Sequence, residues 1–307
     1  MDDKLKTTIE KIVRLASQNA EFDVELRKRL GTTSPASVMT IDDVKLDEIY
    51  EYCIEKVVRK QAADFYSDFP LTTISSALID DFCRMESFRR KDNFGDFCLS
   101  LYQQIECITN TLCNNRELST IVENMMGYPA YIKSGKYINP TIEDRIEGDF
   151  TIAALLFPGK NRKTSLPYSI EKSKIALQSQ YAIDKVRIVV YFLGYRGMMK
   201  SSDFDSYKDF TAVLSDIYMC RNTNHRGNTL TQWEQETLDR VLPNKGVYYL
   251  KFLGALTEYV DCITKGYAEI HAMYGYAQNL KVKQIQLPGP KILGQIDLPN
   301  DGKKRFK

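Results

Sequence analysis

Several patterns that mark common enzyme classes are missing from this sequence. The seven cysteines contain no CxxC pair, and the chain has no Walker loop, no HExxH zinc helix and no GxSxG elbow. These absences remove the usual support for a zinc site, nucleotide hydrolysis, zinc proteolysis and esterase chemistry. We therefore expect neither a metal ion nor a cofactor, and we expect free thiols that pack as small apolar side chains.

Long apolar runs and an excess of one charge are also absent. No run approaches the roughly 20 apolar residues of a transmembrane helix, and residues 1–18 are charged and amphipathic, unlike a signal peptide. We therefore expect a cytoplasmic protein that does not contact a membrane. The 42 basic residues nearly balance the 40 acidic ones, so a nucleic acid would have to bind a local patch and not the whole surface.

Histidine is scarce as well, and one of the two histidines lies in a compact polar cluster. Residues 204–222 carry apolar side chains at helical spacing and lead into the sequence RNTNHRG, which begins at Arg221. A guanidinium group binds phosphate through a fixed fork, and an imidazole transfers protons near neutral pH. Arg221 and His225 therefore offer the side-chain types needed to cleave RNA without a metal ion. The alternative is a helix C-cap, in which these polar groups satisfy the last carbonyls of the helix.

Helical periodicity dominates the rest of the chain, and alternating strand patterns are scarce, which predicts an all-α fold. Thr231 and Glu234 have the spacing of a capping box, which marks the start of a helix. The other histidine, His271, falls in the last expected helix and is interpreted as a packed or surface residue. We expect helices over residues 2–30 (as one helix or two), 43–68, 72–90, 94–114, 173–193, 204–222, from 231 onward, and 247–278.

The chain divides by composition into three parts. Residues 1–70 are expected to form an N-terminal helical region, residues 71–280 a helical domain, and residues 281–307 an extended or disordered tail. Within the domain, residues 127–172 are punctuated by glycine and proline, and we interpret them as an irregular insertion. Its apolar segment, residues 151–157, is expected to be either a helical turn or a short buried strand.

The RNTNHRG sequence, placed after an amphipathic helix, resembles the signature of the HEPN superfamily, the higher eukaryote and prokaryote nucleotide-binding helical domains. The resemblance implies that Arg221 is the motif arginine, Asn222 the polar residue that follows it, and His225 the motif histidine. It also implies that an acidic residue on an earlier helix supports the motif, and Glu106 is the matching candidate. Three residues separate Arg221 from His225, which is a shorter gap than the common pattern of the family.

The fold implied by the resemblance is a HEPN-like helical bundle, here with extra N-terminal helices and the irregular insertion. The implied activity is that of a metal-independent endoribonuclease of a prokaryotic defence or toxin-type system, which cuts RNA at a dimeric Arg/His site and leaves a 2′,3′-cyclic phosphate. Asn224 and Arg226 are candidates for supporting this site. The implied partners are RNA, a second copy of the chain, and an antitoxin or activating partner. The alternative, which the short gap between Arg221 and His225 favours, is a non-catalytic helical module that binds RNA or a protein.

Overall fold

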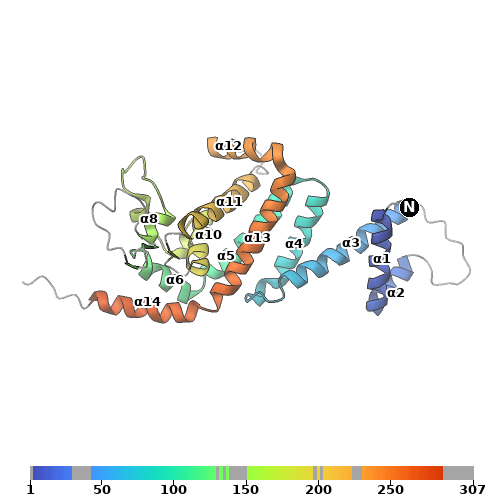
Figure 1. Ribbon diagram of the computed structural model, residues 1–307, viewed down its shortest axis with the longest axis horizontal. Coiled ribbons are helices and arrows are strands. Elements are labelled where there is room, and N and C mark those ends of the chain that lie inside the picture. The colour runs from blue at the N-terminus through green and yellow to red at the C-terminus, as the bar shows by residue number, and fades with distance from the viewer. Residues whose placement is uncertain are drawn as a thin grey trace, which may run out of the picture.

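The computed structural model is predominantly helical, so the all-α class predicted from periodicity is confirmed. Figure 1 shows a large helical bundle and, at the opposite end of the molecule, a smaller arm that the long helix α3 (Asp43–Phe65) joins to it. The structure describes residues 3–29, 43–128, 131–133, 136–137, 151–195, 199–200, 203–222 and 230–285.

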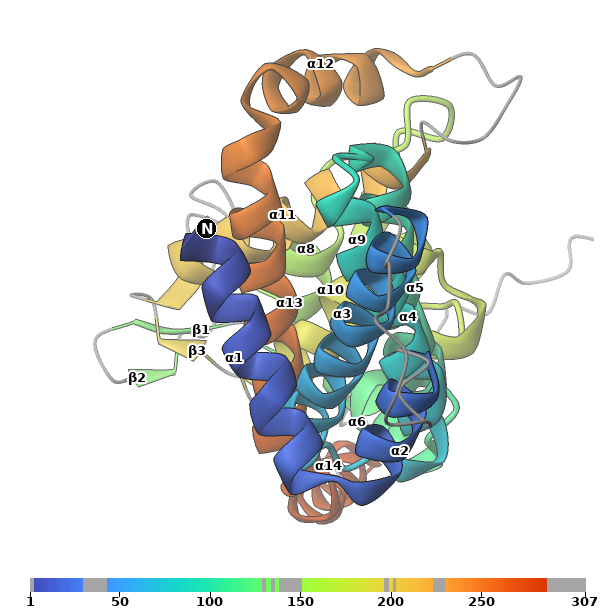
Figure 2. The same cartoon turned by 90° about the vertical axis from the view of Figure 1, so that its right-hand side faces the viewer.

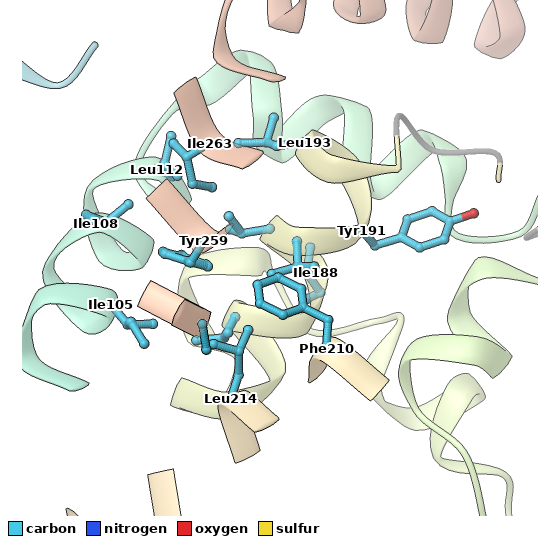
Figure 3. Close-up of a cluster of buried hydrophobic side chains, with 14 of the residues drawn as sticks. Ile105, Ile108, Leu112, Ile188, Tyr191, Leu193, Phe210, Leu214, Tyr259 and Ile263 are labelled. Atoms are coloured by element: carbon cyan, nitrogen blue, oxygen red, sulfur yellow. The ribbon is translucent and has the colours of Figure 1, made fainter. Parts of the chain in front are cut away.

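The main bundle is built from helices whose apolar stripes meet in one core. These helices are α4 (Ser75–Arg90), α5 (Phe94–Cys113), α6 (Arg116–Met125), α10 (Ala182–Val189), α11 (Phe204–Asn222), α12 (Gln232–Val241), α13 (Lys245–Tyr267) and α14 (Ile270–Ile285). Helix α5 is central, because most of its circumference is buried and it packs against α4, α10, α11 and α13. Asn93 caps α5 by accepting a hydrogen bond from the backbone N–H of Asp96 at 3.3 Å. Figure 3 shows Ile105 and Ile108 of α5 in one cluster with Tyr259 of α13.

The expected single helix over residues 173–193 is broken, so this prediction is wrong. The break falls at Gln180, whose side-chain amide donates hydrogen bonds to the backbone carbonyls of Lys172 and Ile175 at 2.7 and 2.9 Å. The backbone of Gln180 is extended, so separate short elements form on either side of it. They are α9 (Tyr168–Lys172), the 3₁₀ turn η2 (Leu177–Ser179), α10, and the π-helix η3 (Val190–Gly194).

The π-helix η3 packs closely against α13 at a glycine. A Cβ atom on Gly266 would collide with the backbone of Leu193, so only a residue without a side chain lets the two elements approach this far. Helix α10, which leads into η3, packs in turn against α5 and α11. These contacts join α5, α11 and α13 in one core.

The N-terminal arm consists of α1 (Asp3–Gln18), α2 (Ala20–Arg29) and the first half of α3. Residues 2–30 therefore form two helices, and the break is at Asn19, whose side-chain oxygen accepts a hydrogen bond from the N–H of Phe22 at 3.1 Å. Figure 2 views the molecule from the arm, with α1 and α2 in front of the bundle. The arm has a small core of its own, made of Phe22, Leu26, Ile49 and Cys53.

The region expected to be an irregular insertion contributes to the main core. Residues 151–157 contain a helix, α8 (Ile152–Leu156), and Thr151 caps it by accepting a hydrogen bond from the N–H of Ala154 at 3.1 Å. The apolar side chains of α8 are buried with those of the bundle. A small sheet has the strand order β2–β1–β3, with β1 antiparallel to β2 and parallel to β3. Its strands are β1 (Tyr131–Lys133), β2 (Lys136–Tyr137) and β3 (Met199–Lys200).

The C-terminal helices differ in part from the expected pattern. The helix expected over residues 247–278 is divided into α13 and α14, and α14 packs against α6, a helix that the sequence pattern did not predict. The capping box of Thr231 and Glu234 at the start of α12 is confirmed, since both of its hydrogen bonds are present. Within the described ranges, every helix is too short or too polar to cross a bilayer.

Candidate functional site

The candidate site lies where the C-terminal end of α11 meets α5. Arg221, in the last turn of α11, reaches across to Glu106 of α5, and its Nη1 atom lies 3.0 Å from Oε2 of the carboxylate. The Arg221 side chain is 17% exposed and that of Glu106 is 33% exposed. The pair is therefore partly shielded from water, where an ion pair is stronger than on an open surface.

Two tyrosines contact the guanidinium group of Arg221. Its Cζ atom lies 4.5 Å from the ring centroid of Tyr102 and 5.1 Å from that of Tyr218. The two rings are 5.3 Å apart and inclined at 58°. Tyr102 lies one turn before Glu106 on α5, and Tyr218 lies one turn before Arg221 on α11. The packing of α5 on α11 therefore brings an acid, an arginine and two aromatic rings together.

Neither tyrosine was among the expected site residues. The sequence contains 19 tyrosines, and those on helical stripes are first interpreted as core residues. Their spacing is the signal that could have found them, because each lies one helical turn from a residue of the candidate motif. Burial raises the pKa of the Tyr102 phenol, while Arg221 lowers it and Glu106 raises it further, so this phenol is neutral at physiological pH.

Asn222 connects the arginine to the next helix. The Nε atom of Arg221 donates a hydrogen bond to Oδ1 of Asn222 at 3.2 Å, and Nδ2 of Asn222 donates to Oε1 of Glu234 at 2.9 Å. Glu234 belongs to the capping box of α12, and the backbone N–H of Thr231, followed by Asn222 and the Thr231 hydroxyl, holds its pKa below the usual range. Glu234 was expected only as a helix cap, but it also fixes Asn222.

Within the described ranges, part of the hydrogen-bonding capacity of the Arg221 guanidinium group is unused. Of the five N–H bonds of an arginine, one at Nε is used by Asn222 and one at Nη1 by Glu106. The remaining three, two of them on Nη2, have no partner among the residues that the structure describes. The arrangement thus holds a positive charge in place and offers an N–H edge to an anion such as a phosphate.

The remaining expected site residues fall in residues 223–229, outside the described part of the chain. They are Asn224, His225 and Arg226. The structure therefore brings together Arg221, Asn222 and Glu106. His271 lies elsewhere: its side chain is 88% exposed and its Nδ1 atom lies 3.1 Å from Glu117 of α6. In Figure 1, α14, which carries His271, is at the opposite edge of the bundle from α12.

Comparison of the chain with protein-family models, with curated proteins and with solved structures finds no match. Among the described residues, no three His, Cys, Asp or Glu side chains gather as a metal site would require. The described part of the site therefore consists of Arg221 in contact with a carboxylate, two aromatic rings and the side-chain amide of Asn222.

Proposed function

We propose that the chain is a HEPN-type, metal-independent endoribonuclease of a prokaryotic defence or toxin-type system. Its bundle would be the HEPN-like domain, and it would act in the cytoplasm on RNA, under the control of an antitoxin or an activating partner. The observation that carries the proposal is the position of Arg221, which Glu106 anchors at 3.0 Å while three of its N–H groups have no partner within the described ranges. A helix cap alone needs neither a carboxylate from α5 nor two aromatic rings around the guanidinium group.

Each residue of the cluster has a role in the proposed reaction. His225 takes the proton from the ribose 2′-hydroxyl or delivers one to the leaving 5′-oxygen. Arg221 stabilises the charge that develops on the scissile phosphate, and Asn222 orients the phosphate or the imidazole. Glu106 anchors the arginine, and Asn224 and Arg226 support the phosphate contact. The expected products are a 2′,3′-cyclic phosphate and a 5′-hydroxyl end.

The proposed enzyme is a two-fold dimer with the Arg221 sites of two copies facing one RNA strand. The described part of one site carries a single guanidinium, that of Arg221, which binds Glu106 directly and is linked through Asn222 to Glu234. One copy therefore offers a single arginine and a single histidine to the strand, and a second copy brings a second pair to the same phosphodiester. Sedimentation of the purified chain at micromolar concentration is expected to show a dimer, with or without RNA. A monomer under both conditions would contradict the two-copy site.

A second candidate function is a non-catalytic helical module that binds RNA or a protein partner. The observation that favours it is the bond from Asn222 to Glu234, which closes α11 onto α12. In this alternative the polar cluster only joins two helices. The short gap between Arg221 and His225 points in the same direction.

Incubation of the purified protein with single-stranded RNA in the presence of EDTA separates the two candidates. The enzyme is expected to cut the RNA, and the fragments should carry 5′-hydroxyl ends that a kinase can label directly and 3′ ends that resist ligation until the cyclic phosphate is removed. Binding without cutting, with and without a cellular extract that could supply an activator, would support the module. Cutting only when Mg²⁺ is restored would contradict a metal-independent mechanism.

A further inference from the structure

Arg221 is restrained in two different ways by the two helices of its site. Glu106 and Asn222 bind two of its N–H groups, which sets the direction in which the guanidinium edge points. Tyr102 and Tyr218 contact it through their rings, at 4.5 and 5.1 Å from Cζ. Ring contacts of this kind restrain a cation, because the negative face of an aromatic ring attracts the positive guanidinium group.

We propose that Tyr102 and Tyr218 are positioning residues whose rings hold the guanidinium group of Arg221 so that its N–H edge meets a phosphate oxygen. The pair of rings is called the tyrosine clamp below. The identity of the ligand as a phosphate of RNA rests on the proposed function. The restraint on Arg221 does not rest on the proposed function, because the contacts with both rings are made within the chain itself.

The Tyr102 hydroxyl indicates that the ring of this residue, and not its hydroxyl group, does the positioning. Tyr102 is 0% exposed, and its oxygen has no hydrogen-bond partner among the described residues. Because it has no such partner, this oxygen does not hold Arg221 by a hydrogen bond, and its burial lowers stability. What Tyr102 provides to Arg221 is its aromatic face, and phenylalanine would provide the same face.

The clamp also explains why an arginine fits this position better than a lysine. A planar guanidinium can lie against a ring, donate a hydrogen bond to Glu106 from one edge and still present N–H groups at another edge. An arginine already held in its binding orientation loses less conformational freedom when it binds an anion. The clamp thus keeps the long side chain of Arg221 in its binding orientation before an anion arrives.

The first test uses the nuclear magnetic resonance signal of the Arg221 Nε–H group in the full-length protein without RNA. The signal is assigned by its loss in Arg221→Lys. Aromatic rings next to a guanidinium displace its proton signal, so the Arg221 signal is expected to lie away from the position of an exposed arginine. Tyr102→Phe and Tyr218→Phe should leave this displacement nearly unchanged, whereas Tyr102→Leu and Tyr218→Leu should reduce it.

The second test measures RNA cleavage under single-turnover conditions with the same four variants. The phenylalanine variants are expected to cut within about twofold of the unchanged protein, and the leucine variants about 10–100-fold more slowly, as misplaced catalytic groups do. Tyr195→Leu is the matched control. Tyr195 is a half-buried tyrosine whose ring packs on Tyr207 at 5.3 Å and not on Arg221, so its loss should change neither readout.

Each outcome decides the proposal. A leucine variant that stays folded with an unchanged Arg221 signal would overturn the clamp, and so would phenylalanine variants that fail as badly as leucine. Because Tyr102 is fully buried, Tyr218→Leu is the variant that separates positioning from folding. If the unchanged protein cuts no RNA either with or without the cellular extract, the proposed function fails, while the Arg221 signal still decides whether the clamp exists.

Discussion

The bundle and the N-terminal arm use the same kind of helix but bury very different amounts of it. Helices α4, α6, α10, α11 and α13 pack against α5 of the bundle, and Leu101 on it is 0% exposed. In the arm, Leu26 is among the few buried residues, and Val13 and Val24 are largely exposed. The candidate site stands on the well-packed region, since Glu106 and Arg221 come from α5 and α11. Precise positioning of a side chain therefore coincides with the part of the molecule that has the continuous core.

The largest expected effect is the loss of a core leucine in the bundle. Leu101→Ala should lower the free energy of unfolding by about 2–5 kcal/mol, because it leaves a cavity that neighbouring helices cannot fill. Leu26→Ala in the arm should cost about 1–2 kcal/mol, since the smaller and more open cluster can collapse. Urea unfolding of the two variants measures both values. Equal losses would show that the arm is packed as firmly as the bundle.

A smaller effect is expected for ion pairs in the two regions. Glu106→Gln removes the partly shielded charge partner of Arg221 and should cost about 1–2 kcal/mol, between the values for surface and buried pairs. Glu25→Gln breaks the pair with Arg29 on α2, in which both side chains are over one-third exposed, and should cost no more than about 0.5 kcal/mol. Thermal unfolding of the two variants at low and at moderate salt concentration compares these losses of stability. A larger loss of stability in Glu25→Gln than in Glu106→Gln would contradict the view that the ion pair of the bundle is the better shielded one.

The smallest effect concerns the pH dependence of the junction between α11 and α12. The pKa of Glu234 is lowered in the folded protein, first by the backbone N–H of Thr231 and then by Asn222. The folded state therefore gains stability from Glu234 above the ordinary glutamate pKa of about 4.3, and this gain is lost as the pH falls through the lowered folded pKa. The melting temperature should drop less between pH 5 and about pH 3 in Glu234→Gln than in the unchanged chain. Identical pH profiles would contradict the assignment.

Sequence patterns predict the parts of this fold that depend on local periodicity. The helical stripes of α5 and α11 and the capping box of Thr231 and Glu234 involve residues within one helix or one turn. The break at Gln180 was missed because it depends on a side chain that binds carbonyls five and eight residues away. Strand β3 was missed because two residues carry no alternating pattern, and its pairing with β1 joins distant parts of the chain.

The candidate site also has residues that the sequence predicts and residues that only the packing of the helices shows. The motif is local, so Arg221 and Asn222 stand out in the sequence, and the family resemblance adds Glu106, which the structure places 3.0 Å from Arg221. Tyr102 and Tyr218 could not be assigned to the site, because a tyrosine on an apolar stripe looks like any other core residue. Only the packing of α5 on α11, 115 residues apart at this contact, shows that their rings meet the arginine.

The most direct test of the central claim is the rate at which folded His225→Ala protein cuts single-stranded RNA in the presence of EDTA. A positioned acid or base contributes about 10²–10⁴-fold to the rate, so the variant should lose cleavage to that extent while its melting temperature stays unchanged. His271→Ala, which alters an exposed histidine beside Glu117, is the matched control and should cut at the normal rate. A capping histidine would instead lower the melting temperature by a few degrees and leave cleavage in proportion to the folded protein. Cleavage that persists in folded His225→Ala protein would contradict the account.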